Sequence, residues 1–146
     1  MQKVNLIIYI AILFIYSSCN NQKENYINSV RIELKKLDDL LLDKYSYVVI
    51  IPGSGCSGCI TEAESFYMRN KENKNIFFVF TDILSIKSIK LKVGKDVIER
   101  KNVFFDKNDV FLSNDYNENI YPLIFNIKEK ENINYHFLNP DEKLTF

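Results

Sequence analysis

The sequence predicts an α/β layered fold with a mixed sheet, built as a single domain. Runs of β-branched and aromatic residues alternate with segments of helical periodicity, a pattern typical of strands and helices packed in layers. The chain has 146 residues, the length of one domain, and its apolar content of 47% is enough for a hydrophobic core. We therefore expect one folded unit, with no internal repeat.

The first half contributes two helices and a strand. Apolar residues recur at spacings of three and four from Tyr26 to Lys44, which predicts a helix with one apolar face. The continuous run YVVII, residues 47–51, is typical of a strand buried on both faces, and the Pro-Gly pair after it is expected to end it. The segment CSGCITEAESFYMRN then has helical spacing, with Asn70 near the helix end.

The second half continues the alternation of strands and helices. Its predicted elements are a buried strand IFFVFTD at 76–82, a helix at 84–100 weakened by Gly94, a short strand NVFFD at 102–106, and the strands YPLIFNI at 121–127 and INYHFLN at 133–139. The charges balance, with 19 Lys and Arg against 19 Asp and Glu. This balance argues against a nucleic-acid partner, because such proteins carry an excess or a stripe of basic residues.

The first 18 residues differ from the rest. A short cationic start precedes an apolar run at 4–16, which falls well short of the roughly 30 Å hydrocarbon core of a bilayer when helical. Small residues then lead directly to Cys19. The segment resembles a bacterial lipoprotein signal, although Tyr16 stands where Leu is common. On this resemblance residues 1–18 are removed and Cys19 is the lipid-modified first residue. Residues 19–25 form a tether, and residues 26–146 form the domain.

An ordinary cleaved signal and an uncleaved anchor are the alternatives, and each places the domain outside the cytoplasm. Two or more acyl chains would hold the protein stably on a membrane of the cell envelope, facing the periplasm. Disulfides persist in that compartment. Because Cys19 is assigned to lipid, Cys56 and Cys59 remain as the pair whose chemistry is to be explained.

A C-x-x-C pair at the start of a helix suits dithiol–disulfide exchange. The first Cys lies where helix N–H groups and the helix dipole stabilise a thiolate, and the second lies one turn further in and can resolve a mixed disulfide. Here an apolar strand, a turn of small residues and an amphipathic helix follow one another in the required order. We therefore predict that Cys56 attacks and Cys59 resolves.

Three features of the sequence occur together: the apolar strand with the C-x-x-C pair and its helix, the strand IFFVFTD, and NVFFD followed by YPLIFNI. Through these features the chain resembles the thioredoxin superfamily over roughly residues 30–139. It is most similar to membrane-anchored thiol–disulfide oxidoreductases. The resemblance implies a three-layer fold with a central mixed sheet and an extra strand–helix segment before a cis-proline. Pro122 would be that cis-proline, with Tyr121 beside it offering backbone pairing to substrate. A trans proline at the start of a strand is the alternative for Pro122.

The resemblance implies no organic cofactor. Its expected partners are disulfides or dithiols of exported proteins and a redox partner protein, and the expected state is a monomer. The chain departs from the family at Gly55, where an aromatic residue is usual, and in lacking a polar residue in the preceding strand and a closing helix. Glu62 and Glu64 would also oppose a thiolate at Cys56, unless they are solvated charges of the helix start.

Other functions have weaker support in the sequence. Beyond Cys19, two cysteines and His136 fall short of the four ligands of a structural zinc site, so we predict no metal. His136 is expected on the strand face opposite Tyr135. Copper delivery, peroxidase chemistry and serine hydrolysis lack their motifs. The main rival is a thioredoxin-like periplasmic binding or adaptor lipoprotein in which Cys56 and Cys59 form an inert structural disulfide.

Overall fold

The computed structural model describes residues 24–37, 40–54, 57–112, 122–129 and 133–138 of the chain. Its centre is a five-stranded mixed sheet with the strand order β3-β2-β1-β4-β5. The strands are β1 (Tyr47–Pro52), β2 (Ile76–Thr81), β3 (Val103–Phe105), β4 (Leu123–Asn126) and β5 (Asn134–Phe137). β1, β2 and β3 are parallel, whereas β4 and β5 each pair antiparallel to their inner neighbour. The α/β class and the mixed sheet predicted from the sequence are confirmed.

The helices connect the parallel strands or precede them. They are a helix over residues 24–37, α2 (Leu41–Lys44), α3 (Ser57–Asn70), α4 (Ile86–Val93) and the 3-10 helix η1 (Lys95–Ile98). α3 joins β1 to β2, and α4 with η1 joins β2 to β3, so both crossovers contain a helix, as is usual between parallel strands. Residues 24–25, which the sequence assigns to the tether, already belong to the first helix. Within the described residues, no helix is both long and apolar enough to cross a membrane.

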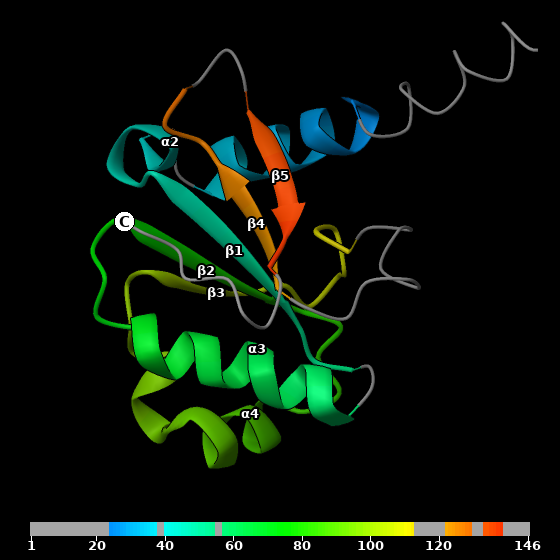
Figure 1. Cartoon of the computed structure of the whole chain (residues 1–146), viewed down its shortest axis with the longest axis vertical. Coiled ribbons are helices and arrows are strands. Elements are labelled where there is room, and N and C mark those ends of the chain that lie inside the picture. Colours follow the sequence, from blue (N-terminus) through cyan, green and yellow to red (C-terminus); the bar gives the residue numbers. More distant parts are fainter. Residues whose placement is uncertain (1–23, 38–39, 55–56, 113–121, 130–132, 139–146) are drawn as a thin grey trace, which may run out of the picture.

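Helices cover the sheet on both faces. Because successive side chains of a strand point to opposite faces, each central strand contributes to two apolar cores. Val48 and Ile50 point into one apolar core with the helix over 24–37 and α2. Val49 and Ile51 point into a second core with α3 and α4, and Figure 1 shows these two helices together on one side of the sheet. β2 is buried along its whole length, which explains why its sequence is a continuous apolar run rather than an alternating one.

Several boundaries differ from the sequence predictions. The helix predicted over Tyr26–Lys44 is divided into the helix over 24–37 and α2, with Leu40 in a turn before α2. Two further differences have a local cause. Pro52 was expected to end the strand but is the last residue of β1, paired in register with Thr81. A proline is tolerated there because the antiparallel pairing of β1 with β4 reaches only to Ile50. The predicted helix over 84–100 is split, because Gly94 has a φ of 102° that only glycine adopts easily, and α4 ends before it.

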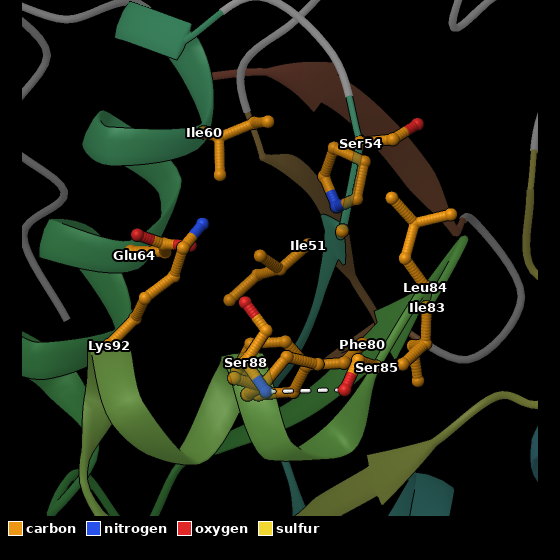
Figure 2. A pocket seen from close by; sticks show the side chains of 13 residues that line it. Ile51, Ser54, Ile60, Glu64, Phe80, Ile83, Leu84, Ser85, Ser88 and Lys92 are labelled. Atoms are coloured by element: carbon orange, nitrogen blue, oxygen red, sulfur yellow. Dashed lines mark hydrogen bonds and ion pairs between the residues drawn. The ribbon is translucent and has the colours of Figure 1, made fainter.

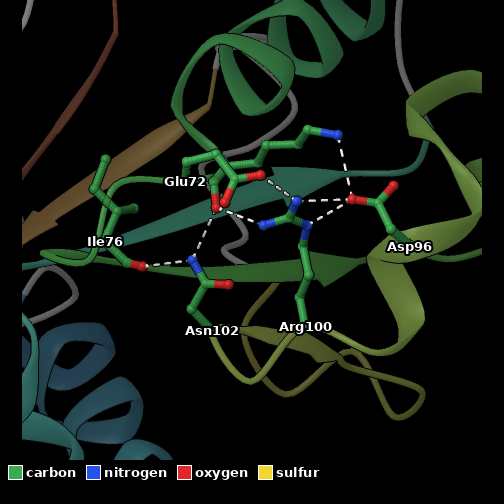
Figure 3. A network of polar contacts seen from close by, with 6 residues as sticks. Glu72, Ile76, Asp96, Arg100 and Asn102 are labelled. Atoms are coloured by element: carbon green, nitrogen blue, oxygen red, sulfur yellow. Dashed lines mark hydrogen bonds and ion pairs between the residues drawn. The ribbon is translucent and has the colours of Figure 1, made fainter.

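An ion-pair cluster around Arg100 lies near the amino ends of β2 and β3, which are the strand ends away from the cysteine segment (Figure 3). Its guanidinium donates to Asp96 Oδ2 at 2.8 Å, to the Lys71 carbonyl at 3.1 Å, and to Glu72 Oε1. These hydrogen bonds lower the pKa of the Glu72 and Asp96 carboxyls. Asn102 donates to two carbonyl oxygens of the same turn, at Lys71 and Ile76. The cluster therefore ties the α3–β2 turn to η1 and to the residues that lead into β3.

Candidate functional site

The cysteine segment lies between the end of β1 and the start of α3. The helix begins at Ser57, directly after Cys56 in the chain, and Cys59 is its third residue. The predicted order of strand, turn and helix is thus present. Gly55, Cys56 and the side chain of Cys59 lie outside the described part of the structure. The neighbouring residues define the surroundings of the pair.

Three parallel strands end at the same edge of the sheet, and the cysteine segment follows β1, the central strand of the five. β1 continues into Gly53 and Ser54, β2 into Asp82, and β3 into Asp106. In open α/β sheets, ligands bind beyond the carboxyl ends of the parallel strands, where the loops converge. This edge is therefore the place where a function is expected, and it is where the sequence puts its cysteine pair.

The loop before the cysteines is held against the end of β2. Gly53 donates its N–H to the Thr81 carbonyl at 2.7 Å, and Ser54 Oγ donates to Asp82 Oδ2. The backbones are so close that a Cβ on Gly53 would lie 2.5 Å from the Asp82 carbonyl oxygen. The loop thus enters the cysteine segment from a fixed position, two residues before Cys56.

Aspartates of the next loop hold the end of β2 in turn. Asp82 has a φ of 52°, and its N–H donates to Asp109 Oδ1 at 2.8 Å. Thr81 Oγ1 donates to Asp106 Oδ2 at 2.9 Å, and the same carboxylate oxygen accepts the Phe111 N–H at 2.8 Å. Asp106 is buried, so these bonds replace its lost hydration. The network extends from the residues after β3, through β2, to the loop that precedes the cysteines.

Sequence reasoning missed this network. The available signal was that β2 and β3 are each followed at once by an aspartate, in TD and FD. The network places negative charge close to the loop that leads into the cysteine segment. The Asp82 carboxylate disfavours a thiolate nearby, whereas the start of α3 favours one.

Pro122 is brought to the same edge as the cysteine segment. Ile50 of β1 pairs with Leu123 of β4, so Pro122 lies one step further toward the end of β1. It is buried, and its carbonyl accepts the Leu138 N–H at 3.0 Å. Tyr121, and with it the peptide bond before Pro122, lies outside the described residues. The same is true of the lipid-attachment candidate Cys19.

The other residues considered from sequence have ordinary roles. Glu62 pairs with Arg69 and Glu64 with Lys92, each at 2.8 Å, so both carboxylates face cations on the helix surface. His136 is exposed on β5, separated from β1 by β4 and on the face opposite the partly buried Tyr135, as expected. No three His, Cys, Asp or Glu side chains among the described residues are grouped so as to hold a metal.

A pocket of about 300 Å³ opens beside the cysteine segment, between α3 and the start of α4 (Figure 2). Its apolar lining comes from the ends of β1 and β2, from α3, and from α4 with the loop before it. The lining residues are Ile51, Pro52, Gly53, Ser54, Ile60, Glu64, Phe80, Ile83, Leu84, Ser85, Ser88, Ile89 and Lys92. The pocket is on the β2 side of β1, whereas Pro122 is on the β4 side.

Comparison of the chain with protein-family models, with curated proteins and with solved structures finds no match.

Proposed function

We propose that this chain is a thioredoxin-like thiol–disulfide oxidoreductase of exported proteins, held on a bacterial membrane by lipid on Cys19. The observation that carries the proposal is the place of the C-x-x-C segment. It follows the carboxyl end of a central parallel strand, and α3 begins at Ser57 between the two cysteines. Pro122 lies at the same edge of the sheet, in support of a substrate groove formed with Tyr121.

The reaction moves two electrons without an organic cofactor. The Cys56 thiolate attacks one sulfur of a substrate disulfide, forms a mixed disulfide, and releases the other substrate sulfur, which takes up a proton. The Cys59 thiolate then attacks Cys56 Sγ. This step forms the Cys56–Cys59 disulfide and releases the second substrate thiol. A redox partner protein returns the pair to its dithiol form, and the reverse sequence would oxidise a substrate dithiol.

The alternative is a binding or adaptor lipoprotein with an inert disulfide. The position of the Asp82 carboxylate favours this alternative. The carboxylate accepts a hydrogen bond from Ser54, and its negative charge opposes a thiolate at Cys56, two residues further along the chain. Both proposals use the same fold and the same anchor. They differ in the acidity and accessibility of Cys56.

The test is the rate of alkylation of each cysteine as a function of pH, on the reduced full-length protein in detergent, with peptide mass spectrometry to separate the sites. Cys59→Ser isolates Cys56, and Cys56→Ser is the matched control. The oxidoreductase predicts an apparent pKa for Cys56 below about 8.5 and a much slower Cys59. An equal or raised pKa, or a pair that is reduced only on unfolding, supports the adaptor. Mass analysis of the mature N-terminus tests acylation of Cys19.

A further inference from the structure

We propose that the pocket between α3 and α4 receives an apolar side chain of the polypeptide whose disulfide the cysteine pair attacks. The inference rests on the proposed function and adds a substrate class to it. The preferred substrates would carry a large apolar residue next to the reacting cysteine.

The position of the pocket is the first reason. Ser54 and Ile60 both line it, and the five residues between them in the chain include both cysteines. A group in the pocket is therefore next to the redox segment. The pocket flanks β1 on the side of β2, while Pro122 flanks β1 on the side of β4. A bound polypeptide would thus be contacted on both sides of the cysteines.

The lining is the second reason. The floor is made of Ile51, Phe80 and Ile89, which are buried in the core between the sheet and its helices. Leu84 stands on the rim with 85% of its surface exposed, and Figure 2 shows it across the opening from Ile60. An exposed leucine beside an apolar floor offers surface that a partner's apolar side chain can cover.

Charge and size argue against an ion or a large cofactor in the pocket. The two charged lining residues, Glu64 and Lys92, neutralise each other at 2.8 Å, so no net charge is left to select an ion. Ser85 is engaged in capping α4, where its Oγ accepts the Ser88 N–H. A volume of about 300 Å³ is the lower end of the range for small-molecule sites, which fits one side chain better than a nucleotide or other large cofactor.

The experiment compares disulfide-linked peptides that differ only at the residue next to the cysteine, which is Leu, Phe, Ala or Lys. Their rates of reduction by the reduced full-length protein are measured in detergent. Leu84→Ser removes the apolar rim and Ser88→Phe fills the pocket. The matched control is Leu91→Ser, because Leu91 is a similarly exposed leucine, at 77%, that does not line the pocket. The rate at which each protein reduces a small disulfide reagent measures the reactivity of the cysteine pair without a contribution from the pocket.

Wild type and Leu91→Ser are expected to react about 10-fold faster with the Leu and Phe peptides than with the Ala peptide. Both pocket variants should lose this preference while reacting at the wild-type rate with the small reagent. If all proteins reduce the reagent but none distinguishes the peptides, or the pocket variants retain the preference, the inference is wrong and the proposed function stands. If the reduced wild type does not react with the reagent, the proposed function fails and the inference with it.

Discussion

Gly53 and Asp82 are in backbone contact: a Cβ added to Gly53 would lie 2.5 Å from the Asp82 carbonyl oxygen. The contact joins the loop that enters the cysteine segment to the residue that follows β2. The Gly53 N–H also donates to the Thr81 carbonyl at 2.7 Å. Only a hydrogen fits between these backbones, so the position of the loop depends on the absence of a side chain.

Gly53→Ala should therefore lower the free energy of unfolding. A backbone oxygen cannot rotate away, so either the loop or the end of β2 must shift, at a cost of about 1–3 kcal/mol. Gly58→Ala is the matched control, because a Cβ on Gly58 meets nothing within 4 Å and the residue is helical. Urea denaturation should show a loss for the first variant and no loss for the second. Equal values for the two would contradict the contact.

Asp106 is expected to be the most sensitive residue of the aspartate network. Asp106→Ala leaves the Phe111 N–H without its acceptor in a buried place, and leaves the Thr81 hydroxyl only the longer bond of 3.5 Å to Asp109 Oδ1. One unsatisfied buried group costs about 1–3 kcal/mol, so we expect a loss of about 2 kcal/mol in the free energy of unfolding.

Asp109→Asn is the control for this change. Asparagine retains an oxygen to accept the Asp82 N–H, and it tolerates the φ of 54° found at this position. Its unfolding free energy should remain within about 0.5 kcal/mol of wild type. A small effect of Asp106→Ala in the same urea titration would mean that the buried carboxylate does not hold the loop after β3.

The central strands could be predicted from sequence because they are runs of β-branched or aromatic residues bounded by polar ones, and β5 because polar and aromatic residues alternate along it. YVVII and IFFVFTD became the two central strands because their lengths and apolarity suit only a strand covered on both faces. Gly94 was expected only to weaken the helix over 84–100, whereas its positive φ divides that segment into α4 and η1. Local chemistry determined the strands, and one sequence was enough to find them.

The surroundings of the cysteine segment could not be predicted in the same way. Ser54 and Asp82 are 28 residues apart, and Thr81 and Asp106 are 25 apart. They meet because β2 lies between β1 and β3, and the sequence patterns set no strand order. The pocket depends on the same arrangement, because α4 must pack beside α3 to form its wall. Long-range register, rather than residue type, determined these contacts.

Arg100 should contribute to stability where a similar surface arginine does not. Its side chain is only 18% exposed and bonds to two carboxylates and a backbone carbonyl, whereas Arg69 is 58% exposed and pairs with one carboxylate among the described residues, that of Glu62. The partly buried bond of Arg100 to the Lys71 carbonyl contributes about 0.5–1.5 kcal/mol, while exposed ion pairs contribute about 0–1 kcal/mol. Urea denaturation should show a loss of about 1–2 kcal/mol for Arg100→Ala and less than about 0.5 kcal/mol for Arg69→Ala. Equal losses would contradict the structural role of the cluster.

Tyr67 makes the stability of the domain sensitive to alkali. Its ring packs against Phe78 and Phe80, with centroids 5.0 and 5.2 Å away, and its hydroxyl has no hydrogen-bond partner among the described residues. Burial raises the pKa of Tyr67 to about 12, since the phenolate would lose its hydration, and Arg100 offsets only part of this effect. Below pH 10 the residue is neutral in both folded and unfolded chains and contributes no pH dependence.

Between pH 10 and 12 the unfolded chain releases the Tyr67 proton and the folded chain keeps it, so the free energy of unfolding falls as the pH rises. The expected loss reaches about 2 kcal/mol near pH 12, at about 1.4 kcal/mol for each pH unit. Tyr67→Phe lacks this proton and retains every other tyrosine, so it serves as the control. Urea unfolding of both proteins from pH 8 to pH 12 should give curves that separate above pH 10, with wild type losing more. Parallel curves would mean that the Tyr67 hydroxyl reaches water in the folded protein.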